Sequence, residues 1–163
     1  LNCITDFYKY ISEIYMHPIK FSESIKIHST QERAFDYTQD YDKRLVWDTF
    51  LIKADLIDGA REAAVGVKAY CVAHNGMGME TEYVSFNRPK VTAIKMTKGP
   101  YMFKDFLGSW NFKTIGPNEI EVIFLYSFML RFPFNLLNPF IKWNLKRNVR
   151  QRLIDLKNQL EKI

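Results

Sequence analysis

The chain has 163 residues, of which 47% are hydrophobic and 25% are charged, a balance that predicts one globular domain with a sizeable core and excludes a disordered tail. Its 13 Phe, 9 Tyr and 3 Trp form an aromatic share of 15%, so we expect the domain to enclose or contact something large and apolar. The net charge of +5 is concentrated in residues 131–163, with eight basic and two acidic residues, whereas a nucleic-acid binder spreads its basic residues over a contact face.

The first segment has apolar residues at helical spacing. These are Ile4, Phe7, Tyr8, Ile11, Ile14 and Tyr15. The spacing predicts an amphipathic helix, which Pro18 would end. We therefore expect an N-terminal helical extension over residues 1–17 and a single domain over residues 18–163.

The next segment predicts one strand and two short helices. Residues 19–28 alternate apolar and polar side chains, as a half-buried strand does. Ser29 is followed three residues later by Glu32, which is the pattern of a capping box at the start of a helix. Asp40 is a suitable cap for a second short helix that runs to about Trp47.

Six strand-length segments then follow, separated by short turns rich in Gly, Pro, Asn and Asp. They cover residues 51–57, 63–74, 79–86, 91–97, 103–115 and 119–130. Successive strands with short connections predict an antiparallel meander. After Pro133 the apolar spacing changes to three or four residues and continues to Ile163, which predicts a long C-terminal helix.

The sheet must bury one apolar face, and the C-terminal helix is the only large partner for it in the sequence. We therefore predict an α+β fold in which a curved antiparallel sheet of about seven strands wraps around that helix. A curved sheet closed by a single helix leaves space between the two, so an internal cavity is expected.

The order of elements resembles the helix-grip fold of the START and Bet v 1-like (SRPBCC) superfamily, particularly its bacterial polyketide cyclase/dehydrase-like members. The matching segments are SIKIHSTQERAFDYTQDYDKRLVWDTF with its Trp47-Asp48 pair, KGPYMFKDFLGSWNF with Gly108 and Trp110, and RNVRQRLIDLKNQLEKI. The likeness covers about residues 19–163. It implies a cavity for a hydrophobic small molecule, such as a lipid, quinone or polyketide-like compound, and it does not imply catalysis.

Ten residues are candidates for ligand binding, chosen from the inward faces of the predicted strands, the helix stripe and the expected cavity entrance. They are Trp47, Tyr70, Tyr83, Trp110, Phe112, Phe124, Tyr126, Phe128, Ile141 and Leu145. Gly108 on the same inward face would make room for a ligand. The alternative is that these rings fill the core, and Trp47 in particular is expected to plug a gap between the small helices and the sheet.

The polar residues support an enzyme only as an alternative. Tyr83, Tyr126 and Arg152 could provide general acid-base assistance in a cyclase, aromatase or dehydrase, whereas His74 adjoins a turn and is expected to be exposed. No spacing indicates a metal site, a nucleophilic triad or a nucleotide loop, so no cofactor is expected. Arg152 lies within the apolar stripe of the last helix and is expected to reach the rim or to pair with an acid.

The C-terminal helix has a basic face made of Lys142, Lys146, Arg150 and Lys157. Three interpretations of this face and of the nearby Phe140, Trp143 and Ile154 stay open. The N-terminal helix could cover the apolar residues, the face could simply be solvated, or it could make a weak contact with a membrane surface. We rank them in that order.

Cys3 and Cys71 cannot form a disulfide framework, no apolar run reaches the roughly 18 residues that span a bilayer, and no signal-peptide pattern is present. These features predict a cytoplasmic protein. The leading functional hypothesis is binding or carriage of a hydrophobic small molecule, with no nucleic-acid partner. The alternatives are the cyclase-type enzyme and a peripheral membrane or partner-docking module.

Overall fold

The computed structural model describes residues 17–162, so the helix predicted within residues 1–17 lies outside the described residues. The helical elements are α2 (Gln31–Gln39), α3 (Arg44–Trp47), the 3₁₀ helix η1 (Phe134–Leu137) and α4 (Asn138–Lys162). The strands are β1 (Ile19–His28), β2 (Leu51–Leu56), β3 (Lys68–Ala73), β4 (Gly78–Asn87), β5 (Val91–Lys98), β6 (Phe103–Gly116) and β7 (Glu119–Leu130).

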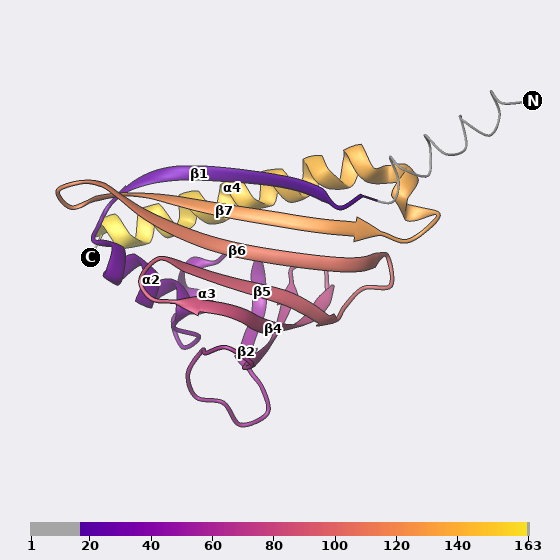
Figure 1. Cartoon of the computed structure of the whole chain (residues 1–163), viewed down its shortest axis with the longest axis horizontal. Helices are drawn as coiled ribbons and strands as arrows, with labels where there is room; N and C mark the ends of the chain where they lie inside the picture. Colours follow the sequence, from indigo (N-terminus) through magenta and orange to yellow (C-terminus); the bar gives the residue numbers. More distant parts are fainter. Residues whose placement is uncertain (1–16, 163) are drawn as a thin grey trace, which may run out of the picture.

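The strands form one antiparallel sheet in the order β1-β7-β6-β5-β4-β3-β2. The last strand of the meander therefore pairs with the first, and β2 lies at the opposite edge. Figure 1 shows α4 running beside β1 and β7, with α2 and α3 near its C-terminal end. This arrangement confirms the predicted helix-grip fold.

The core lies between the inward faces of β6 and β7 and the helix α4, which packs against β1 and β7. Side chains alternate along both strands, and the inward members of β7 include Val122, Phe124 and Phe128, each at most 3% exposed. Four α4 residues in the same core cluster are almost fully buried as well. They are Val149, Leu153, Leu156 and Leu160. Burial of such a side chain contributes about 1.5–3 kcal/mol, so this contact holds the helix on the sheet.

The structure corrects three local predictions. Thr30, not Ser29, caps α2, because the Thr30 hydroxyl accepts the N–H of Arg33 at 3.3 Å. The second helix is shorter than predicted, since Asp40 ends α2 and α3 begins only at Arg44. Strand β3 begins at Lys68 because Gly66, with φ of +85°, turns the chain just before it.

The cap assignment is testable by two alanine substitutions at adjacent positions. Thr30→Ala removes the acceptor of the Arg33 N–H and is expected to lower the free energy of unfolding by about 1 kcal/mol. Ser29→Ala is expected to change it by less than about 0.5 kcal/mol, because the buried Ser29 hydroxyl has no hydrogen-bond partner among the described residues. Urea unfolding measures both, and equal losses would contradict the assignment.

Candidate functional site

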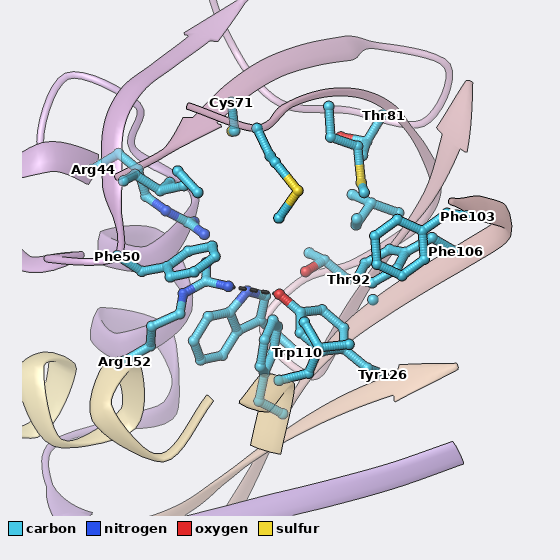
Figure 2. A pocket seen from close by; sticks show the side chains of 18 of the residues that line it. Arg44, Phe50, Cys71, Thr81, Thr92, Phe103, Phe106, Trp110, Tyr126 and Arg152 are labelled. Carbon is cyan, nitrogen blue, oxygen red and sulfur yellow. Dashed lines mark hydrogen bonds between the residues drawn. The ribbon is translucent and has the colours of Figure 1, made fainter. Parts of the chain in front are cut away.

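A cavity of about 150 Å³ lies between the concave face of the sheet, the α3 region and α4 (Figure 2). Most of its wall is apolar. The larger lining side chains include Phe50, Leu51, Met77, Met79, Ile94, Phe103, Phe106, Trp110, Phe124 and Leu145. Met77 is 42% exposed, and Phe50 and Leu145 are partly exposed. The cavity is therefore least covered between the β3–β4 turn, the segment before β2 and the first half of α4.

Gly108 contributes to the shape of the cavity. It pairs with Tyr126 across β6 and β7. A Cβ atom at this position would lie 3.1 Å from Cε1 of Tyr126 and 3.3 Å from Cδ1 of Ile94, which is tighter than ordinary van der Waals contact. Glycine thus lets the Tyr126 ring lie against β6, and Gly108 itself forms part of the wall, as the sequence predicts.

One side of the cavity holds a buried ionic cluster, which we define as Arg44, Asp48, Arg152 and Tyr126. Asp48, at 0% exposure, follows α3 and accepts from Nε of Arg44 at 2.9 Å. Arg152 of α4 donates to the same carboxylate from Nη2 at 2.7 Å and from Nε at 3.0 Å. Its Nη1 donates to the Tyr126 hydroxyl of β7 at 2.7 Å, a contact drawn as a dashed line in Figure 2.

The cluster keeps its charges because its members compensate for burial. Burial alone would raise the pKa of Asp48, but the guanidinium groups of Arg152 and Arg44 hold it below its ordinary value. Burial disfavours the charged form of Arg152, yet the carboxylate of Asp48 raises the pKa of Arg152 above normal. Burial also raises the pKa of Tyr126, so this hydroxyl keeps its proton at neutral pH.

A second polar chain links α2 and the segment after it to β4. The hydroxyls of Tyr41 and Tyr83 are 3.1 Å apart, and that of Tyr83 donates to Oε1 of Gln39 at 2.9 Å. Burial raises the pKa values of both tyrosines and of the Cys71 thiol, which also line the cavity. These groups therefore present neutral, protonated side chains.

Five of the ten predicted residues line the cavity, namely Tyr83, Trp110, Phe124, Tyr126 and Leu145. Four others are buried in the core outside its wall, namely Trp47, Phe112, Phe128 and Ile141. Trp47 fills the gap beneath α3, as the plug interpretation predicts, with its ring edge-on to Trp110 at 5.9 Å.

Tyr70, the tenth predicted residue, lies on the other face of the sheet from the cavity. Cys71 and Ala73 line the cavity from β3, so alternation places Tyr70 on the outer face, where Lys53 Nζ lies 5.7 Å from its ring centroid. Alternation shows which residues share a face. Because both faces of this short strand carry apolar side chains, the pattern does not show which face lines the cavity. His74 is exposed in the following turn, as predicted.

Sequence reasoning missed Arg44 and Asp48 as partners within one site, although both stand in the segment that carries the family resemblance. The signal was Arg152, a charged residue within an apolar helix stripe that needs an acid nearby. The structure confirms this pairing and identifies Asp48 as the acid. Asn148, which shares the stripe, instead donates to Asn144 at 3.1 Å on the helix surface.

The outer face of α4 makes its own ion pairs. Lys146 and Arg150 contact Glu23 of β1 at 3.1 and 2.6 Å, and Lys157 donates to the carbonyl of Lys26 at 2.9 Å. Trp143 is 56% exposed, and other apolar residues near the start of α4 are exposed too. The prediction that the N-terminal helix covers them concerns residues 1–16, which are outside the described part of the chain. Membrane contact by this face stays a prediction.

Within residues 17–162, no helix is long and apolar enough to cross a membrane. The same residues contain no group of three or more His, Cys, Asp or Glu that could hold a metal ion.

Comparison with known proteins places the fold. A family model described as polyketide cyclase/dehydrase and lipid transport matches residues 18–161. Among curated proteins, no sequence matches the chain. A START superfamily protein from Mycobacterium smegmatis has a TM-score of 0.72 and 11% identity, over 88% of this chain and 97% of that chain.

Two further solved structures share the fold of the chain. Major latex-like protein 151 from Panax ginseng has a TM-score of 0.68 and 15% identity, over 88% of this chain and 97% of that chain. The di-domain ARO/CYC StfQ from the steffimycin biosynthetic pathway has a TM-score of 0.74 and 12% identity, over 99% of this chain and 57% of that chain. At these identities the likeness establishes the shared fold.

The ionic cluster predicts how stability depends on pH. The folded-state pKa of Asp48 is lowered, so its contribution is complete above the unfolded value of about 3.9 and is lost as pH falls through the folded pKa. Asp48→Asn leaves two buried cations without a counter-charge and is expected to cost about 3–5 kcal/mol at pH 7. Its deficit relative to wild type should shrink towards pH 3.

Urea unfolding at several pH values between 7 and 3 measures this effect. Asp42→Asn, at an exposed position in the preceding turn, is the matched control and should follow the wild-type curve. An Asp48→Asn deficit that stays constant with pH would show that the charge of Asp48 is not what stabilises the fold.

Proposed function

Because the chain belongs to the polyketide cyclase/dehydrase and lipid transport family, we propose that it binds and carries a hydrophobic small molecule in the cavity between its sheet and α4. The observation that carries the proposal is the cavity wall itself, in which aromatic, aliphatic and methionine side chains surround a few oriented polar groups. Small-molecule sites have this composition, since the apolar wall supplies affinity and the polar groups orient the ligand.

The size of the cavity limits which part of a ligand it can hold without rearrangement. A volume of about 150 Å³ accommodates a ring-sized group, as cavities of this volume bind benzene. Longer ligands would displace Met77 and Met79, whose unbranched side chains adapt readily to new shapes. Both stand beside the least covered part of the wall, so a ring or the end of a chain would enter there.

The ionisable groups favour binding over proton-transfer chemistry. General acid-base catalysis is most efficient when the catalytic pKa lies near the working pH. Burial raises the pKa values of Tyr41, Tyr83, Tyr126 and Cys71, which moves each of them away from neutrality. Among the described residues, no His, Asp, Glu or Lys lines the cavity. A carrier requires none of these groups, whereas a cyclase or dehydrase would have to use a tyrosine that holds its proton firmly.

The proposal predicts that filling the cavity blocks ligand binding. Thr81 is 8% exposed and lines the cavity, so Thr81→Leu is expected to weaken binding of a medium-chain fatty acid, a short-chain quinone or a naphthol at least about tenfold, or about 1.4 kcal/mol. Val84 on the same strand is 46% exposed, and Val84→Leu is the matched control.

Titration monitored by tryptophan fluorescence measures these affinities, because Trp110 lies in the wall. Native mass spectrometry of freshly purified protein adds an independent search for a bound molecule. Failure of every compound to bind wild-type protein, or equal binding by both variants, would contradict the proposal.

A further inference from the structure

The charge of the cavity wall is unbalanced. Arg44 and Arg152 both line the cavity with their guanidinium groups, whereas Asp48 is not one of the described residues that line it and is 0% exposed. Among the described residues, the other ionisable side chains that line the cavity are neutral. They are Tyr41, Cys71, Tyr83 and Tyr126. Two cations share one counter-charge, so the buried site has a net charge of +1.

The two guanidinium groups also retain donors that the protein does not use. Each has five N–H groups. Those of Arg44 donate to Asp48 from Nε and to the carbonyl of Thr38 from Nη1, and the Nη2 atom makes no hydrogen bond within the described residues. Nη1 and Nη2 of Arg152 each make one such bond, although each has two N–H groups.

Aromatic rings hold both guanidinium groups in place. Arg152 lies 5.0 Å from the ring centroid of Phe124 and 5.3 Å from that of Phe50, and Arg44 lies 4.8 Å from that of Trp47. Cations over ring faces are attracted to them, which leaves the N–H edges for acceptors. Figure 2 shows both head groups on the same side of the cavity, across from Phe103 and Phe106.

Tyr126 adds a third donor at the same place. Its oxygen already accepts from Arg152 at 2.7 Å, and its proton makes no hydrogen bond within the described residues. A hydroxyl polarised in this way donates well to an anion, and arginine recognises a carboxylate through two parallel hydrogen bonds. The facing part of the wall is mainly apolar, with Ile94, Phe103 and Phe106, and its polar side chains are the neutral hydroxyls of Thr81 and Thr92.

We propose that this cavity selects a carboxylate-bearing amphiphile, whose head group binds Arg44, Arg152 and the Tyr126 hydroxyl while its apolar body lies against β5 and β6. The inference rests on the proposed function and adds the chemical class of the ligand. A bound carboxylate would neutralise the excess charge of the site and accept the donors that the protein leaves unused. A neutral alcohol of the same length would do neither.

The test compares decanoate with decan-1-ol, which share an apolar chain and differ in the head group. Isothermal titration calorimetry on the full chain at pH 7.5 is expected to give at least tenfold tighter binding of decanoate. Arg44→Gln removes one cation and leaves the Asp48–Arg152 pair intact, so it should weaken decanoate at least tenfold and decan-1-ol less than twofold. Arg88→Gln, at an exposed arginine paired with Asp36, removes the same charge from the surface and should leave both affinities unchanged.

A second measurement does not depend on the folding of a variant. Decanoate labelled with ¹³C at the carboxyl carbon reports its own ionisation by NMR, and when bound to wild-type protein its pKa should lie below that of the free acid. A bound carboxyl with an unchanged or raised pKa overturns the inference.

The outcomes separate the two proposals. If decan-1-ol binds as tightly as decanoate, or if only neutral lipophiles bind, the inference of an anionic head group is wrong and the proposed carrier function stands. If no lipophile of any class binds, the proposed function fails and the inference fails with it.

Discussion

The carboxylate of Asp48, held between the guanidinium groups of Arg44 and Arg152, joins α3 to α4 and, through Arg152, to β7. Arg152 stands in the apolar stripe of α4 between Val149 and Leu153, which are at most 1% exposed. Sliding or rotating α4 would withdraw this guanidinium from Asp48 and from Tyr126 of β7. A buried charge without its partner costs several kcal/mol, so the cluster selects one arrangement of α3, α4 and β7 that hydrophobic contact alone would specify less sharply.

The same cluster also gives the cavity its positive charge. Its role in stabilising the fold and its role in setting the charge of the cavity favour different numbers of buried charges. Stability alone would favour an equal number of buried positive and negative charges, or none. The chain instead keeps Arg44 beside Arg152 with one carboxylate between them, which leaves a positive wall facing the cavity. Sites that bind ligands commonly keep such locally unfavourable features, because the ligand supplies the missing interaction. The excess charge is therefore informative about what the cavity accepts.

Sequence periodicity was sufficient for the fold because β6 and β7 alternate over most of their length and α4 has a continuous apolar stripe. Periodicity was not sufficient to predict which of the inward-facing residues reach the cavity. Alternation places Phe112, Phe124 and Phe128 on one face, yet Phe112 packs on Phe35 and Phe128 on Phe103, towards opposite ends of the sheet. Only Phe124, near the middle, reaches the cavity. Which strand residues lie beside the cavity depends on how the sheet packs on α4, and this packing cannot be read from alternation. The acid that pairs with the buried Arg152 depends on the same packing.

The segments that carry the family resemblance are also those that build the positive wall. Trp47 and Asp48 come from one segment and Trp110 from another, and the Trp110 ring contacts Trp47 and lies 5.9 Å from each guanidinium carbon. Changing these residues would disturb the fold and the proposed head-group recognition together. The opposite part of the wall includes Met77, Met79 and Thr81. Within the described residues, none of these three side chains forms a hydrogen bond with the ionic cluster. Under the proposed function, ligand length and shape can therefore change there while the fold and the proposed recognition of an anionic head group are kept.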